Sequence, residues 1–350
     1  MLRVSLITLG DPQQMTGGYL YHRRMATAAD AHQATLRFVS CPDLAFPLGA
    51  LRARRALRRA REDDVVVIDS IAAWPVAPWV RGEASPPLVV MSHQVPGGID
   101  HATARMLVQA RFDEHTYRRA RLLLVASETL ADDLRARQFP PDRIRVVPPG
   151  RDPATPSGPR PDLRAGRHVA FLCVGNWIPR KGILDLLDAF ARLPADSATL
   201  HLVGDEHVDR RYRERVVARL REPALRKRVV THGPLSAATV AAMYQAADAF
   251  VLPSTKEPYG TVIGEALAAG LPVVGWDAGN LPHLATSDRE GVIVTVGDVG
   301  GLAAALLRLA EDDPYRRRLA EGARRRGQTL PTWDDTARLF YAALHEAATG

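Results

Sequence analysis

The sequence predicts an α/β protein made of two doubly wound, Rossmann-like domains. Near-continuous apolar runs alternate with helical stretches, which is the pattern of a parallel sheet covered by helices on both faces. The alternation is interrupted once, by a segment rich in proline and glycine at residues 148–167, and then restarts. At 350 residues the chain is longer than a domain with a single hydrophobic core usually is, and its length suits two domains of roughly 150 residues each.

Five apolar runs predict the strands of the first half of the chain. A glycine pair, Gly17 and Gly18, follows the first run and opens a helix that we expect to reach about Ala31. Helical stretches separate the other runs. The five runs are residues 2–10, 34–40, 64–69, 87–93 and 121–127.

Six further runs predict the strands of the second half. Between them, residues 183–193 carry apolar side chains at helical spacing. A later helix over residues 261–270 is stopped by Gly270 and Pro272. The six runs are residues 168–174, 198–204, 228–233, 249–254, 271–276 and 291–296. We therefore expect domains over 1–150 and 168–330, a linker over 151–167 and a C-terminal segment over 331–350, with the active site in a central cleft between the domains.

The composition is that of an ordinary globular protein with a basic charge balance. The net charge of +7 suits an anionic ligand, a nucleic acid or an anionic membrane, without choosing among them. No apolar run reaches the ~20 residues of a membrane-spanning helix, and two cysteines give no disulfide framework, so we expect a cytoplasmic protein. Only three of the 46 basic residues are lysines, and two of these, Lys181 and Lys256, lie in the motifs described next.

The strongest motif is VLPSTKEPYGTVIGEALAAG at residues 251–270. A strand ends at Ser254, a loop carries Glu257, and a helix begins near Thr261 after Gly260. Free backbone N–H groups at a helix start bind anions, and glycine lets the backbone approach a phosphate closely. Glu265 lies ~6 Å along the helix from its start. The two glutamates can therefore flank a bound diphosphate, each accepting hydrogen bonds from vicinal hydroxyls.

Three more motifs have the same strand–loop–helix form or lie at a strand end. In FLCVGNWIPRKG, Arg180 and Lys181 sit together at the start of a helix, which makes an anion clamp built without metal. In SLITLGDPQQMTGGYLYH, Gly17 and Gly18 precede a helix. In PPLVVMSHQVPGG, His93 lies just past a buried strand. The remaining histidines on expected helices, His22 among them, are interpreted as surface or packing residues.

These motifs resemble glycosyltransferase family 4, the large retaining group with the GT-B fold, over nearly the whole chain. In that family the glutamate matching Glu257 contacts the transferred sugar, and the one matching Glu265 holds the ribose of the nucleotide. The lysine matching Lys181 contacts the diphosphate, and the histidine matching His93 contacts the sugar near the reacting carbon. The resemblance also implies that the glycine loop at Gly17 and Gly18 faces the diphosphate, and that residues 331–350 cross back to the first domain. It further implies that the backbone of four residues approaches the sugar and phosphates: Tyr259, Gly260, Thr261 and Val262.

The resemblance implies a hexosyl-type transferase that moves a sugar from a UDP- or GDP-sugar to an acceptor with retention of configuration. His93, Lys181 and Glu257 would be its catalytic residues, and no metal or other cofactor is expected. One residue departs from the family pattern: Asn176 stands where many members have an arginine, so Arg180 is a candidate replacement for the missing cation. The rival interpretations are a nucleotide-sugar epimerase on a similar fold and a nucleotide-sugar-binding protein with weak catalysis.

The acceptor, a small molecule, glycan or lipid, is expected at the strand ends of the first domain, with four candidate contacts: Tyr19, Asp69, Trp74 and Gln94. The basic run at residues 52–61 resembles a helix that docks some family members on anionic membrane, which would place the protein at the inner membrane face. No aromatic residues interleave with these arginines, which argues against nucleic acid. The acidic pairs match no metal-site geometry, and no G-x-x-x-x-G-K-[ST] phosphate loop is present.

Overall fold

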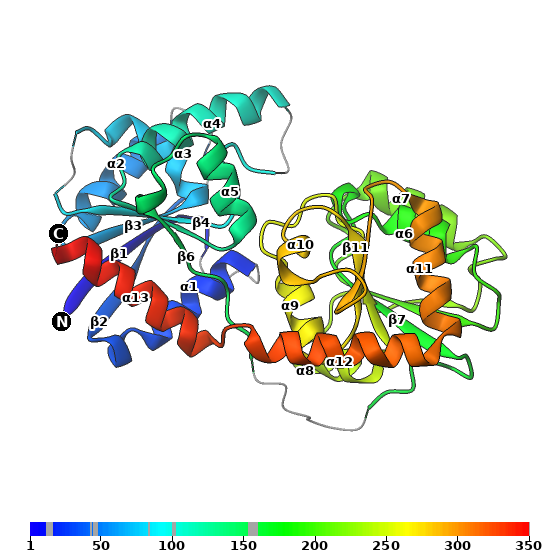
Figure 1. The fold of residues 1–350 in the computed structure, drawn as a ribbon. Helices are drawn as coiled ribbons and strands as arrows, with labels where there is room; N and C mark the ends of the chain where they lie inside the picture. The colour runs from blue at the N-terminus through cyan, green and yellow to red at the C-terminus, as the bar shows by residue number, and fades with distance from the viewer. Residues whose placement is uncertain are drawn as a thin grey trace. The chain divides into compact units, whose positions relative to one another are not determined.

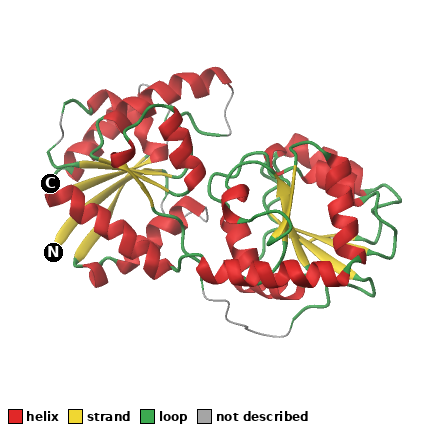
Figure 2. Cartoon of the chain, viewed as in Figure 1, coloured by secondary structure: helices red, strands yellow, loops and turns green. Residues whose placement is uncertain are grey.

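The computed structural model describes residues 1–11, 17–42, 44, 48–82, 85–99, 103–152 and 160–349 (Figure 1). The chain forms two compact units. The first comprises Met1–Gly150 together with Pro331–Gly350, and the second comprises Arg151–Leu330. In each unit a six-stranded sheet is covered by helices on both faces (Figure 2). The predicted α/β fold of two doubly wound domains is thus confirmed.

The sheet of the first unit has the strand order β2-β1-β3-β4-β5-β6, with all neighbours parallel. Sequence reasoning missed its last strand, which is three residues long and ends shortly before Pro148. The strands are β1 Leu2–Leu9, β2 Ala34–Cys41, β3 Val65–Asp69, β4 Leu88–Ser92, β5 Leu122–Val125 and β6 Ile144–Val146. The helices are α1 Gly17–Ala28, α2 Leu48–Ala60, α3 Ala73–Val76, α4 Thr103–Arg118 and α5 Glu128–Ala136.

The last helix of the chain, α13 Trp333–Thr349, packs on the first unit against α1 and the strands β3, β4 and β5. Thr336 Oγ1 donates to the carbonyl oxygen of Pro148 at 2.8 Å. The Tyr341 hydroxyl donates to the carbonyl oxygen of Met25 at 2.7 Å. Phe340 and Leu344 of the same helix are fully buried. Residues 331–349 are therefore part of the first unit, and α13 contributes to its core.

The sheet of the second unit has the order β12-β11-β10-β7-β8-β9, again with all neighbours parallel. All six of its strands were predicted from the sequence. They are β7 Val169–Val174, β8 Ala198–Val203, β9 Val229–Thr231, β10 Ala249–Val251, β11 Val273–Trp276 and β12 Gly291–Val294. The helices are α6 Ile183–Phe190, α7 Arg210–Leu220, α8 Ala237–Ala246, α9 Thr261–Ala268, α10 Leu281–Leu284, α11 Val299–Glu311 and α12 Asp313–Thr329.

Both sheets contain a topological switch point, where the strand order reverses. In the first unit it lies between β1 and β3, and in the second between β7 and β10. Open α/β sheets bind ligands beyond the carboxyl ends of the strands at such points. The loops that follow β1, β3, β7 and β10 are therefore where functional side chains are expected.

Part of the expected linker belongs to the second unit. Residues 153–159 lie outside the described residues, but Leu163 is buried in the core of that unit. Its carbonyl oxygen accepts hydrogen bonds from Thr199 Oγ1 at 2.7 Å and from the ring of His201 at 2.8 Å.

Within the described residues, no helix combines the length and apolar character needed to span a membrane.

Candidate active site

Lys181 lies beyond the carboxyl end of β7, at the switch point of the second unit. Its stem runs along Gly175, where an added Cβ would lie 3.4 Å from Lys181 Cδ. The Lys181 ammonium reaches a carboxylate oxygen of Glu257 at 2.5 Å, and both side chains are largely buried. Because Glu257 follows β10, the ion pair bridges the two strands between which the sheet order reverses.

The two loops that carry this pair are bound to one another. The backbone N–H of Thr255 donates to the carbonyl oxygen of Arg180 at 2.8 Å, and Ser254 Oγ donates to the same oxygen at 3.1 Å. On its other side, the Glu257 carbonyl accepts from the N–H of Asn280 at 2.9 Å. An added Cβ at Gly279 would lie 2.6 Å from the Glu257 nitrogen, so the backbone on both sides of the carboxylate is closely packed.

Arg180 lies beside the pair. Its guanidinium Nη1 donates to the carbonyl oxygen of Lys256 at 2.8 Å and lies 3.9 Å from the Glu257 carboxylate. Asn176, which departs from the family pattern, is exposed, and its side-chain oxygen accepts from the backbone N–H of Asp205 at 3.1 Å. A cation is therefore present beside Lys181, supplied by Arg180 and not by position 176.

Helix α9 begins at the same place. Gly260 caps it with a φ of 71°, in the left-handed region that favours glycine. The first bonds within the helix are donated by the N–H groups of Ile263 and Gly264 to the Gly260 carbonyl. The N–H groups of Thr261 and Val262 precede these bonds, in the position from which helix starts bind anions.

Glu265 lies on the next turn of α9. The Tyr244 hydroxyl donates to its carboxylate at 3.1 Å. Burial raises the pKa of Glu265, and the hydrogen bond from Tyr244 opposes that change. The side chain is held in place by a neighbouring helix, α8, which carries Tyr244.

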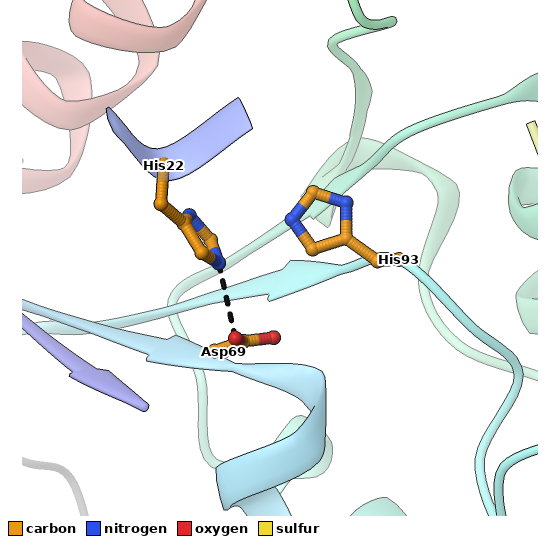
Figure 3. A group of neighbouring side chains, drawn as sticks. All are labelled: His22, Asp69 and His93. Carbon is orange, nitrogen blue, oxygen red and sulfur yellow. Dashed lines mark ion pairs between the residues drawn. The ribbon is translucent and has the colours of Figure 1, made fainter. Parts of the chain in front are cut away.

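The switch point of the first unit holds a second group of polar side chains, drawn in Figure 3: His22 of α1, Asp69 at the end of β3 and His93 after β4. All three are buried. The His22 Nε2 atom lies 3.1 Å from an Asp69 carboxylate oxygen. The rings of His22 and His93 meet edge to face with their centroids 4.9 Å apart. An added Cβ at Gly18 would lie 3.6 Å from the His93 ring, so the first turn of α1 is next to this histidine.

The surroundings of this group lower the pKa values of both Asp69 and His93. Burial raises the pKa of Asp69, but the charge of His22 and hydrogen bonds from His22 and Thr8 outweigh it and lower the pKa to about 2. Burial and the charge of His22 lower the pKa of His93 to about 3, against the opposing effect of Asp69. At neutral pH the carboxylate is therefore ionised and His93 is a neutral ring.

Sequence reasoning interpreted His22 as a surface or packing residue, and the structure has the second: its side chain is fully buried and lies 3.1 Å from the Asp69 carboxylate, a contact that the sequence did not predict. One signal could have found it. His22 lies four residues after Gly18 on α1, and such positions share a helix face.

A second difference concerns metal ligands. The sequence showed no cluster of metal-binding residues, whereas this group brings three possible ligands together. One ligand atom from each residue lies within 4.8 Å of the other two, and His22 Nε2 and the Asp69 carboxylate are 3.1 Å apart.

The four candidate acceptor residues lie on different elements of the first unit. Asp69 belongs to the buried cluster, and the Tyr19 hydroxyl donates to the carbonyl oxygen of Leu9. Trp74 lies against α2, 3.5 Å from the position of an added Cβ on Gly49. The fourth, Gln94, is half-buried and accepts a hydrogen bond from Ser92 through its carbonyl.

Two family descriptions match most of the chain. Residues 2–150 match the "Glycosyl transferase 4-like domain", and residues 161–326 match "Glycosyl transferases group 1". Among curated relatives, a D-inositol 3-phosphate glycosyltransferase from Xylanimonas cellulosilytica is 34% identical over 208 residues, covering 56% of this chain and 49% of the relative. An MMP alpha-(1->4)-mannosyltransferase from Mycolicibacterium hassiacum is 32% identical over 228 residues, covering 65% and 54%. The chain thus spans about half the length of these relatives.

Solved structures show the same fold. Sucrose-phosphate synthase from Thermosynechococcus elongatus superposes with a TM-score of 0.83 at 22% identity, covering 99% of both chains. Anabaena Alr3699/HepE in complex with UDP and glucose gives a TM-score of 0.82 at 20% identity, covering 99% of this chain and 100% of that one. By its family matches and its fold, the chain carries the two domains of a group 1 glycosyltransferase of the GT-B kind.

Proposed function

We propose that this protein transfers a hexose from a UDP- or GDP-sugar to an acceptor, with retention of anomeric configuration and without a metal ion. The observation that carries the proposal is the Lys181–Glu257 pair at the switch point of the second unit. It joins a cation suited to phosphate with a carboxylate suited to sugar hydroxyls. The start of α9 lies on the same loop as the carboxylate.

The donor diphosphate would lie at the start of α9 and be neutralised by Lys181 and Arg180. Negative charge grows on the diphosphate as the bond to the sugar breaks, and fixed donors stabilise that charge without reorganisation. Loss of one such donor typically costs about 3 kcal/mol of transition-state stabilisation. The backbone N–H groups of Thr261 and Val262 supply further donors, which only substitution by proline would remove.

The two glutamates would hold the two ends of the donor. Glu257 accepts hydrogen bonds from the transferred sugar, and Glu265, held by Tyr244, accepts them from the ribose. His93, neutral at working pH, orients the sugar from the first unit beside Gly18. For retention we propose front-face attack, in which a phosphate oxygen of the leaving group takes the proton of the acceptor hydroxyl. Inversion at the anomeric carbon of the product, seen by NMR, would contradict this step.

A thermal-shift screen tests the donor site directly. UDP-, GDP-, ADP- and dTDP-sugars are added to the purified protein in EDTA, starting with UDP-glucose. A donor at 100 times its Kd stabilises the fold by about 2.7 kcal/mol. We expect Tm to rise with the sugars of one nucleotide only. This rise should be lost in the Glu265→Gln variant and kept in Glu311→Gln, the control variant, because Glu311 is exposed. No shift with any donor would reject the proposal, and conversion of the sugar without acceptor would instead favour an epimerase.

Helix α2 favours a further partner, the anionic membrane surface. Its buried side faces the first unit, and the arginines of residues 52–61 lie on its exposed side. Leu48 and Leu51 are exposed on the same helix, with exposed fractions of 61% and 55%. Basic and apolar side chains together suit an interface of anionic lipid. Sedimentation with vesicles containing phosphatidylglycerol, but not with phosphatidylcholine alone, would support this contact, and equal sedimentation with both would reject it.

A further inference from the structure

We propose that His22 is a positioning residue for His93, acting through Asp69 and through direct ring contact. The inference rests on the proposed function, which puts His93 against the transferred sugar. It concerns a histidine that neither the sequence motifs nor the family resemblance singled out. Three features of the first unit support it. The carboxylate of Asp69 is held by several donors, the ring of His93 is packed by α1, and both histidines can pair with the negative charge of Asp69.

The carboxylate of Asp69 is fixed by several donors at the ends of neighbouring strands. Thr8 Oγ1 of β1 donates to it at 2.8 Å, and His22 Nε2 of α1 lies 3.1 Å from the same oxygen. The Ser70 hydroxyl donates to the other oxygen at 3.3 Å. The backbone N–H of His93 donates to that hydroxyl at 3.2 Å. A continuous chain of polar contacts therefore joins His22 to the backbone of His93.

The ring of His93 is confined by three residues of α1. The rings of His22 and Tyr21 both meet it edge to face, each with a centroid distance of 4.9 Å. Gly18 approaches the ring from the same helix. Packing from α1 thus restricts which way the His93 nitrogens face, and a ring held in one orientation can present one nitrogen to a sugar hydroxyl.

His22 and His93 compete for the charge of Asp69. Among the described residues, the titratable groups around His93 are His22 and Tyr21 on α1, Asp69 at the end of β3, and Tyr117 of α4, which contacts the preceding Ser92. The two tyrosines are neutral at pH 7, so the fixed charge that faces His93 is that of the Asp69 carboxylate, and His22 is the other imidazole beside that carboxylate. While His22 pairs with Asp69, His93 stays neutral and can serve the sugar. Without His22, the buried carboxylate would pair with His93 and stabilise its protonated form, with the proton taken from solvent.

The test uses the full chain and follows the His93 ring by ¹⁵N–¹H NMR from pH 5 to 8, assigned through His93→Asn. In the unaltered protein the ring should stay neutral over the whole range. In His22→Phe, which keeps an aromatic ring but removes the partner of Asp69, His93 should become protonated within the range. Adding Asp69→Asn to that variant should return His93 to the neutral form, which a merely structural role of His22 would not do.

Turnover supplies the second readout. In His22→Phe we expect kcat with the donor identified in the thermal-shift screen to fall about 10²-fold, as for a misplaced reacting group, with a smaller change in donor KM. His115→Phe is the matched control, because His115 lies on α4 outside the cluster, 3.2 Å from the Val80 carbonyl oxygen. It should change neither the His93 titration nor kcat.

The outcomes separate this proposal from the proposed function. A His93 ring that stays neutral in a folded His22→Phe protein overturns the positioning role, whatever the donor screen shows. A protonated ring that Asp69→Asn reverses supports it, even with no donor present. If His22→Phe fails to fold, His22→Asn replaces it, because an amide can donate to Asp69 but carries no charge, and the same titration of His93 decides.

Discussion

At the scale of single residues, Asp113 of α4 is a buried carboxylate whose ionisation opposes folding. Burial raises its pKa to about 7, although the Gly97 N–H donates to it at 2.8 Å. The folded protein therefore keeps a proton on Asp113 that the unfolded chain loses near pH 3.8. As the pH rises from about 4 to 7, this group should lower the free energy of unfolding by about 1.4 kcal/mol per pH unit. Asp113→Asn cannot ionise, so its stability relative to the unaltered protein should rise between pH 5 and 8.

Urea unfolding at the two pH values measures this difference. Asp142→Asn is the matched control, because Asp142 lies in the same unit and is exposed. Its stability relative to the unaltered protein should be the same at both pH values. If Asp113→Asn also shows no change between pH 5 and 8, the carboxylate of the folded protein is already ionised at pH 5, and the effect of burial on its pKa has been misjudged.

At the scale of elements, the loops after β7 and β10 set up a competition between Glu257 and phosphate for Lys181. The backbone around Glu257 is packed by Gly279 and Asn280, so a diphosphate can take its place on Lys181 only if the carboxylate rotates away. A bound sugar would offer that carboxylate new partners, but inorganic pyrophosphate would not. Glu257→Gln should therefore bind pyrophosphate about tenfold more tightly, equivalent to about 1.4 kcal/mol, while binding the nucleotide sugar more weakly.

Calorimetric titration with pyrophosphate and with the donor gives both affinities. Glu311→Gln, an exposed carboxylate on α11, changes the net charge equally and should leave both unaltered. Pyrophosphate affinity that is unchanged or lower in Glu257→Gln would show that the ion pair does not compete with the phosphate. The same titration on Lys181→Met should show pyrophosphate binding lost.

The contrast between the two switch points shows what a sequence can predict. Lys181 and Glu257 were predicted because each lies in a local strand–loop–helix motif, where glycines and helix starts fix the backbone. The group of His22, Asp69 and His93 joins three elements that are far apart in sequence. Apolar spacing predicts that a helix covers the sheet, but not which polar residue of that helix meets a strand end. Strand β6 was missed for a related reason, since three residues are too few to show a period.

At the scale of the whole molecule, the C-terminal helix makes the first unit depend on the far end of the chain. Leu344 of α13 is fully buried in that unit, whereas Leu339 of the same helix has an exposed fraction of 36%. Leu344→Ala should lower the stability of the first unit by about 3 kcal/mol, the usual cost of a cavity in a core. Leu339→Ala should have little effect.

Hydrogen exchange read by mass spectrometry in mild urea distinguishes the two units, because peptides from each are followed separately. In Leu344→Ala, faster exchange should appear in peptides from β1 to β6 and α13, and peptides from β7 to α12 should exchange as before. The reason is that, among the described residues, the buried core of the second unit is assembled from residues 163–323, with none supplied by α13. Faster exchange spread equally over both units would mean that the chain unfolds as one cooperative body, and α13 would then stabilise the whole molecule and not the first unit alone.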